Sequence, residues 1–306
     1  MRCAIALILW ISLGPMAFSA SFDCNGPLNQ IGRTICGNSA LSKADEDLQA
    51  SYRRALEVSL LREELETEQV DWRSSLLPDA ADPRRLLDAY RKRISELQTE
   101  ERASEPVSEA QAARACVTVP GMPKRTTCRV ETFGGVKGDT SGTLRFQHLT
   151  FWDSDDAQQF PEEDIVVFRK VIGDPELVEP IAAAAGEAVI FDTVEFIESP
   201  IGNWILMTGH SGEHGYSEIL YRDERAGRPA LIDTGSWQED LRRRVPDGFA
   251  LAAYIKPDYR TMSAKAVFTI GGEPCCAANY ITSIIQLGIS VDRLVLETVR
   301  FERNTK

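Results

Sequence analysis

The spacing of apolar residues changes once along this chain, and that change limits the possible folds more than any other feature. From Leu41 to Trp72 apolar side chains recur every three or four residues with charged residues between them, which predicts one long amphipathic helix. Asp82 and Pro83 then provide an N-cap and a first-turn proline, and residues 86–97 repeat the helical spacing. The N-terminal part is therefore predicted to be an antiparallel helical hairpin.

Beyond residue 106 the apolar residues alternate with polar ones, as they do in half-buried strands. The segments with this pattern are 189–199, 203–209, 217–223, 266–270 and 281–302. A short helix is expected at 236–245, with Ser236 as its cap. Sandwich and barrel arrangements both fit, and no internal repeat is strong enough to indicate a propeller. The second part is therefore predicted to be mainly antiparallel β.

Residues 1–20 have the pattern of a secretory signal peptide. Arg2 precedes an apolar run over residues 4–13, and small residues follow, which places the expected mature start at Ala20 or Ser21. The run is shorter than the ~20 apolar residues that a membrane-spanning helix needs. We therefore expect a soluble protein that is periplasmic or secreted.

These patterns together predict an α+β multi-domain protein. Its parts are a signal peptide over 1–20, a helical domain over 21–105 and a mainly β domain over 106–306. Residues 101–114, rich in Ser, Glu and Ala, are expected to be a linker or a fraying helix end. The aromatic residues Tyr52, Trp72 and Tyr90 fall on the helical stripes, so we expect them to pack in the core.

The composition is acidic, with 46 Asp and Glu residues against 34 Lys and Arg residues and a formal net charge of −12. This balance argues against nucleic acid and anionic membranes as partners, because both would repel the chain. It favours solubility or basic partners.

The first two cysteines after the apolar run, Cys24 and Cys36, are predicted to form a disulfide. A metal site would need further ligands nearby, and the first histidine is His148; a redox pair would usually have the C-x-x-C spacing. A lipid anchor on Cys24 would need a small residue before it, and Asp23 stands there. The disulfide would pin a short helical segment to the start of the long helix.

Four further cysteines lie in the second part. Cys116 and Cys128 flank a turn-like segment and are predicted to pair across a hairpin, which leaves Cys275 and Cys276 to bond each other. In the alternative pairing, Cys116 and Cys128 each take one of the two adjacent cysteines. We favour the first arrangement, and the second stays open.

A family resemblance follows from several of these elements in order. The chain contains, in order, FDC, an eleven-residue gap to IC, the helix LSKADEDLQASYRRAL, the pair Trp72 and Arg73, and AYRKRISEL. Together these elements resemble the lysozyme-inhibitor LprI N-terminal domain family. The resemblance covers residues 22–98. It implies an exported helical domain and, from the family's name, a protein that inhibits a cell-wall-cleaving muramidase by protein contact.

The sequence departs from that family at a second cysteine pair that many members carry. Leu76 or Leu77 and Leu86 stand in the corresponding regions here. We therefore expect apolar packing to close the helical hairpin in place of a second disulfide.

Acidic side chains on the helices offer two interpretations. The clusters are Asp45, Glu46 and Asp47, and then Glu63, Glu64, Glu66 and Glu68. They would complement a basic lysozyme-type enzyme. They also alternate with Arg53, Arg54 and Arg62, which is typical of an ordinary solvated helix face. The solvated face is the favoured interpretation.

Two motifs in the second part suggest chemistry. HSGEH, residues 210–214, has the H-x-x-E-H spacing of a zinc protease, but the glycines around it favour a turn between strands. DSDDAQQFPEED, residues 153–164, lacks the mid-loop glycine of a calcium loop and is predicted to be an acidic surface loop. We assign no catalytic, cofactor or metal residue.

The sequence therefore favours an exported, non-catalytic binding protein. Its partner is expected to be a basic lysozyme-type enzyme or another envelope protein. The alternative is an envelope module whose β domain recognises another protein or a glycan, and a hydrolase is the least favoured.

Overall fold

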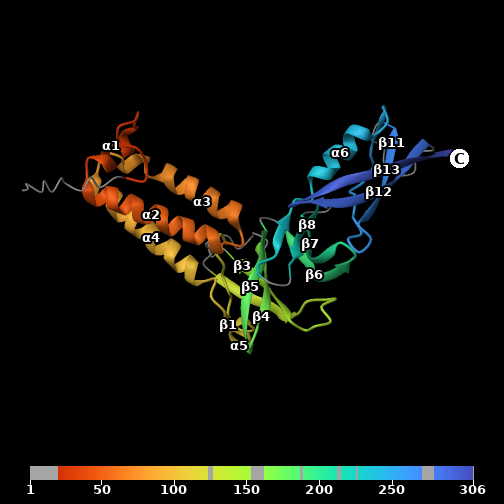
Figure 1. Ribbon diagram of the computed structural model, residues 1–306, viewed down its shortest axis with the longest axis horizontal. Helices are drawn as coiled ribbons and strands as arrows, with labels where there is room; N and C mark the ends of the chain where they lie inside the picture. Colours follow the sequence, from red (N-terminus) through yellow and green to blue (C-terminus); the bar gives the residue numbers. More distant parts are fainter. Residues whose placement is uncertain are drawn as a thin grey trace, which may run out of the picture. The chain divides into compact units, whose positions relative to one another are not determined.

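The computed structural model describes residues 20–122, 127–152, 162–186, 189–211, 215–224, 227–270 and 279–305 (Figure 1). These residues divide into two compact units. The helical unit contains the described residues up to Val58 together with Glu66–Glu101. The β unit contains Ser59–Leu65 and the described residues from Arg102 onward. The predicted fold class, helices followed by antiparallel sheets, is confirmed.

The helical segments are α1 (Gln30–Cys36), α2 (Ser39–Val58), α3 (Arg62–Ser75), the 3-10 helix η1 (Leu77–Asp79) and α4 (Pro83–Arg102). Figure 1 shows α2, α3 and α4 side by side. Asp45 of α2 bonds Tyr90 of α4, and Arg54 pairs with Glu101 further along both helices, so α2 and α4 run in the same direction. No helix in the described part of the chain is long and apolar enough to cross a membrane.

The single helix predicted from Leu41 to Trp72 is wrong, because the chain breaks it into α2 and α3. At the break the Ser59 hydroxyl accepts a hydrogen bond from the Leu61 nitrogen (3.2 Å) and donates one to the Pro120 carbonyl (2.9 Å). Leu61 is buried in an apolar core of the β unit. This burial and the local side-chain hydrogen bond override the helical pattern, which contains no Gly or Pro at this point.

The described residues form two disulfides, Cys24–Cys36 in the helical unit and Cys116–Cys128 in the β unit. Both are the pairings favoured from the sequence. The second disulfide excludes the alternative in which Cys116 and Cys128 bond the adjacent pair. Cys275 and Cys276 lie outside the described residues, so their pairing stays a prediction.

The described residues of the β unit form three antiparallel sheets, with strand orders β1-β5-β4-β3-β2, β6-β7-β8-β9 and β10-β11-β12-β13. The first sheet contains β1 (Val107–Ser108), β2 (Thr127–Gly135), β3 (Leu144–Trp152), β4 (Glu162–Val171) and β5 (Asp174–Gly186). The second contains β6 (Ile190–Ser199), β7 (Gly202–Ser211), β8 (Gly215–Asp223) and β9 (Ala230–Ile232). The third contains β10 (Phe249–Leu251), β11 (Ser263–Ile270), β12 (Asn279–Ser290) and β13 (Arg293–Thr305).

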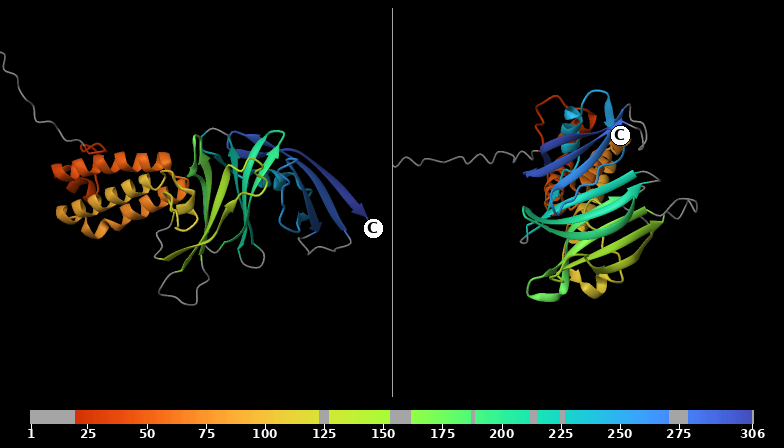
Figure 2. Two further views of the ribbon diagram at one scale, coloured as in Figure 1. Left: turned by 90° about the horizontal axis from the view of Figure 1, so that it is seen from below. Right: turned by 90° about the vertical axis from the view of Figure 1, so that its right-hand side faces the viewer.

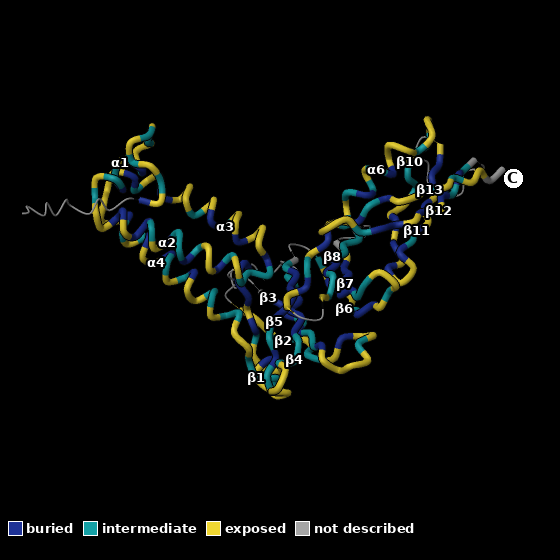
Figure 3. The backbone as a smooth tube through the Cα atoms, viewed as in Figure 1, coloured by how far each residue is buried: buried dark blue, intermediate teal, exposed yellow. Residues whose placement is uncertain are grey.

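The sheets pack face to face in chain order (Figure 2). One apolar core lies between the first and second sheets, and another lies between the second and third together with α6 (Ser236–Arg244). A further core covers the outer face of the first sheet. Figure 3 shows the buried stretches along these strands. The arrangement is therefore a stack of open sheets, and its four-stranded meander recurs three times without a sequence repeat.

Two local predictions in the β unit are corrected. The N-cap residue of α6 is Gly235, and the preceding Asp233 bonds the start of the helix: its Oδ1 accepts hydrogen bonds from the backbone nitrogens of Gly235 (2.7 Å) and Ser236 (3.2 Å). The Ser236 hydroxyl instead donates to the Leu294 carbonyl. The predicted linker also contains ordered elements, because β1 pairs with β5 and the short helix α5 (Glu109–Ala112) follows it.

Candidate functional site

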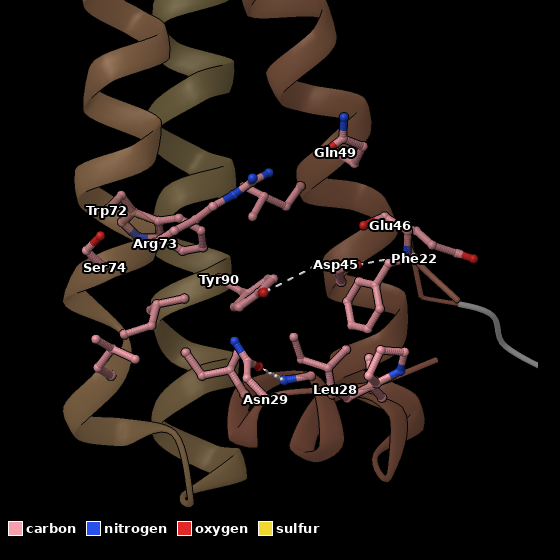
Figure 4. A pocket seen from close by; sticks show the side chains of 18 of the residues that line it. Phe22, Leu28, Asn29, Asp45, Glu46, Gln49, Trp72, Arg73, Ser74 and Tyr90 are labelled. Carbon is pink, nitrogen blue, oxygen red and sulfur yellow. Dashed lines mark hydrogen bonds between the residues drawn. The ribbon is translucent and has the colours of Figure 1, made fainter. Parts of the chain in front are cut away.

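A groove of about 1100 Å³ opens in the helical unit (Figure 4). Its lining comes from the segment before α1, from α1, α2, α3 and α4, and from Leu76 and Leu77 between α3 and α4. Polar and apolar surface line it in similar measure, and four of the lining side chains are charged. A concave site of this size and mixed character is typical of ligand or peptide binding.

The floor of the groove depends on the position of α1, which three local features fix. The Cys24–Cys36 disulfide ties the segment before α1 to its last residue. Asn29 caps the helix, since its Oδ1 accepts a backbone hydrogen bond at 2.8 Å. The Thr34 hydroxyl donates to the Ala80 carbonyl at 2.7 Å and so ties α1 to the connection between α3 and α4.

One wall is formed by an aromatic pair from two helices. The rings of Trp72 and Tyr90 meet edge to face with centroids 5.2 Å apart. Tyr90 is buried, as predicted, whereas Trp72 is half-buried. Both rings line the groove, so they pack in the core and present surface to a ligand. Burial, with the nearby charge of Asp45, raises the pKa of Tyr90 well above its ordinary value, which keeps its hydroxyl a hydrogen-bond donor.

A buried carboxylate lies next to this pair. Asp45 accepts hydrogen bonds from the Tyr90 hydroxyl (3.3 Å) and from the Ser21 backbone nitrogen (2.8 Å), and Figure 4 shows it between Tyr90 and Phe22. Only 8% of its surface is exposed. Its role is therefore to hold the segment before α1 against the bundle.

The predicted acidic clusters are dispersed in the structure. Asp45 is buried, Asp47 pairs with Lys43 at 2.7 Å, and Glu46 remains at the groove. In the second cluster Glu68 pairs with the buried Arg93 at 2.9 Å. The side chains of Glu63, Glu64 and Glu66 are exposed on α3. Asp45 and Asp47 therefore do not contribute to one continuous acidic patch that could recognise a basic partner.

The groove's rim is apolar on the side of η1. Leu77 is 65% exposed, and Leu28 and Ile31 of the opposite side are half-exposed. Arg53 and Arg73 add positive charge to the lining. Leu28 and Leu77 lie outside the helical stripes, so the sequence pattern does not indicate this rim; an apolar residue beside a proline, as at Leu77, is the available signal.

The other sequence candidates lie in the β unit. His210 is on β7, and its Nδ1 lies 3.2 Å from the Asp192 carboxylate. The rest of the motif, residues 212–214, lies outside the described residues, as do residues 153–161 of the acidic loop. Among the residues that the structure covers, no group of three or more His, Cys, Asp or Glu side chains is placed to hold a metal ion.

Comparison of the sequence with known families and proteins gives no further assignment. No protein-family model matches the chain, and no curated protein matches it significantly.

Proposed function

We propose that this protein is an exported binding protein that holds part of another protein in the groove of its helical unit. The groove carries the proposal, because an exposed leucine, a half-buried tryptophan and charges of both signs surround one concave site. Such mixed lining suits a protein segment better than a single small charged molecule. The protein acts in this proposal by binding, without catalysis.

The proposed partner is a lysozyme-type muramidase. The resemblance over residues 22–98 implies this class, and the acidic composition suits a basic enzyme through long-range attraction. Export is supported by the signal-like pattern of residues 1–20 and by the two disulfides, which persist in oxidising compartments.

The test is the lysis of peptidoglycan cell suspensions by a c-type lysozyme, with the full mature chain titrated in. We expect stoichiometric inhibition. Leu77→Asp places a charge on the apolar rim and should raise the concentration for half inhibition about tenfold or more, as loss of an interface anchor does.

The matched control is Val70→Asp. Val70 is 60% exposed on α3 and does not belong to the groove's lining, so this variant should inhibit within about twofold of the unaltered chain. Absence of inhibition at large excess would remove the muramidase as partner. Equal inhibition by the Leu77→Asp chain would remove the groove as the site.

A further inference from the structure

The groove of the helical unit carries a local charge opposite in sign to that of the whole chain. The charged side chains of its lining are Asp45, Glu46, Arg53 and Arg73. Both acids have partners within the protein, whereas the two arginines have none among the described residues. The charge that remains for a ligand to meet is therefore positive.

The partners of the two acids are close to them. Asp45 is 8% exposed and accepts hydrogen bonds from the Tyr90 hydroxyl and the Ser21 backbone nitrogen. The Glu46 carboxylate lies 3.9 Å from the ammonium of Lys43, one turn earlier on α2. A cationic ligand would have to compete with groups that the protein itself supplies.

The two arginines differ from most cations around them. In the described helical unit the Arg33 side chain bonds the Leu28 carbonyl, and six other cations pair with acids: Lys43, Arg54, Arg85, Arg91, Lys92 and Arg93. Among its described Lys and Arg residues, only the side chains of Arg53, Arg73 and Arg84 have neither an ion pair nor a hydrogen bond. Arg53 and Arg73 line the groove, and Arg84 does not. Acids outnumber bases in this chain by 46 to 34, so a shortage of acids does not explain the two unpaired arginines.

Hydrogen-bond donors gather at one end of the groove. Gln49 and Arg53 are four residues apart on α2, so they lie on one face of that helix, and both belong to the lining. Figure 4 shows Gln49 and Arg73 on one side of Tyr90, with Leu28 and Asn29 on the other. The Gln49 amide also has no hydrogen-bond partner among the described residues. Two guanidinium groups and one amide are therefore available at the end of the groove away from α1.

Accessible apolar side chains gather at the other end, near α1. Leu77 is 65% exposed, and Leu28 and Ile31 are half-buried. Asp45, which bonds Tyr90, and Arg53 are eight residues apart on α2, a rise of about 12 Å. An extended segment covers that distance in about four residues.

A carboxylate is the group of a protein segment that fits the donor end. Guanidinium groups donate paired, charge-assisted hydrogen bonds to carboxylates, and a glutamine amide adds a further donor. Polypeptides carry carboxylates on Asp and Glu side chains and at the chain end. A lysine or arginine of the partner would instead meet two unpaired like charges.

We propose, building on the function proposed above, that the groove holds a protein segment with a carboxylate about three residues from an apolar side chain. Arg53 and Arg73 bind the carboxylate, and Gln49 adds a hydrogen bond. The apolar side chain lies against Leu28 and Leu77. The partner can still be basic as a whole, because long-range attraction acts on net charge whereas the groove contacts one local group.

The test is the affinity of the full mature chain for short peptides, measured by saturation-transfer NMR as each peptide is titrated. The probes are acetyl-Leu-Ala-Ala-Glu-amide and its analogues with Gln or Lys in the last position. The Glu peptide should bind about tenfold more tightly than the Gln peptide, and the Lys peptide should bind most weakly. Acetyl-Leu-Ala-Ala-Ala with a free terminal carboxylate, compared with its amide, tests the chain end as the source of the carboxylate.

The double variant Arg53→Gln with Arg73→Gln should bind the Glu and Gln peptides equally. Both positions are exposed, so the fold does not depend on these side chains. The matched control is Arg84→Gln, because Arg84 is also exposed and unpaired among the described residues but lies outside the lining. This control should keep the preference for the Glu peptide within about twofold.

Equal binding of the Glu and Gln peptides by the unaltered chain would overturn the proposal, as would a preference that survives in the double variant. Tighter binding of octanoate than of the Glu peptide would assign the groove to fatty acids and would also overturn it. Inhibition of lysozyme without binding of any peptide would leave the proposed function standing and remove this inference alone. A preference for the Glu peptide without inhibition of lysozyme would support the carboxylate site and remove only the muramidase as partner.

Discussion

The backbone nitrogen of Ser21 lies 2.8 Å from Oδ2 of Asp45, a carboxylate buried against α4. Ser21 is one of the two mature starts expected from the sequence. Cleavage before it would turn this amide nitrogen into an α-ammonium group, and the hydrogen bond would become an ion pair with Asp45. Hydrogen bonds to charged groups contribute about 1.5 to 3 kcal/mol.

We predict that a chain beginning at Ser21 is more stable at pH 6.5 than one with Gly-Ser added before Ser21. An ammonium that gains a partner on folding has its pKa raised, so its contribution is complete below about pH 7.7, the ordinary α-amino value, and is lost as pH rises through the folded pKa. The difference in melting temperature between the two chains, followed from pH 6 to 10, measures this contribution of the α-ammonium group. Asp45→Asn in both chains should abolish the difference, and equal stability of the unaltered pair would contradict the ion pair.

Arg93 is predicted to be the most sensitive charged residue of the helical unit. It is 1% exposed, with Nε bonded to the Gln69 side chain at 3.0 Å and Nη1 to Glu68 at 2.9 Å. Arg93→Ala should cost about 3 kcal/mol, because it leaves the buried Gln69 amide without its partner. The double variant Arg93→Met with Gln69→Leu should recover most of that loss.

Urea unfolding followed by far-ultraviolet circular dichroism at 222 nm measures both variants. Lys92→Ala is the control, since Lys92 is the exposed neighbour of Arg93 on α4 and should cost less than about 0.5 kcal/mol. A similar loss in the single and double variants would mean that packing around Arg93 dominates over its hydrogen bonds.

Asp233→Ala should destabilise the β unit by about 1 kcal/mol through loss of its two hydrogen bonds to the start of α6. The Gly235 nitrogen, in particular, lowers the pKa of the Asp233 carboxyl by hydrogen bonding. Its ionised form therefore contributes stability above about pH 3.9, and the contribution is lost as pH falls through the lower folded pKa. Thermal unfolding between pH 2 and 6 should show a smaller acid dependence for Asp233→Asn. Glu239→Ala, on the same helix, should not change it.

Glu218→Gln should change how stability depends on pH. Compared with the unaltered chain, the variant should lose less stability between pH 4 and pH 7. Burial raises the pKa of Glu218, against hydrogen bonding from Tyr259 and the charge of Lys256. A raised carboxyl pKa gives its full stability below the unfolded value of about 4.3, and that stability is lost as pH rises through the folded pKa. The glutamine side chain does not ionise, so the variant does not lose stability in this way. Melting temperatures at pH 4 and 7 give the comparison, and a constant difference between the two chains would contradict it.

The sequence indicated the apolar stripes of the helices, since residues on them such as Leu41 and Leu97 are buried, but it did not indicate the break after Val58. It did not indicate β2 to β5. In β4, Ile165 and Val167 face one apolar core while Val166 and Phe168 face another. A strand buried on both faces has a continuous apolar run and no alternation, so the period-two pattern is absent.

The candidate groove was beyond sequence analysis for a different reason. Phe22, Leu28, Trp72 and Leu77 come from separate segments, and packing of the helices brings them together. The pairing of Cys24 with Cys36 was predictable, because its short spacing left few alternatives. The orientation that this disulfide gives to α1 depends on tertiary contacts such as Thr34 with Ala80.

Ser59–Leu65 belong to the β unit although helical-unit residues flank them on both sides, so the chain passes between the two units three times. The helical unit and the β unit therefore cannot be exchanged cleanly by recombination at a single point. A gene fusion cut after residue 105 would carry Leu61 away from the residues that bury it. Any transplant of the helical unit would have to redesign the turn between α2 and α3.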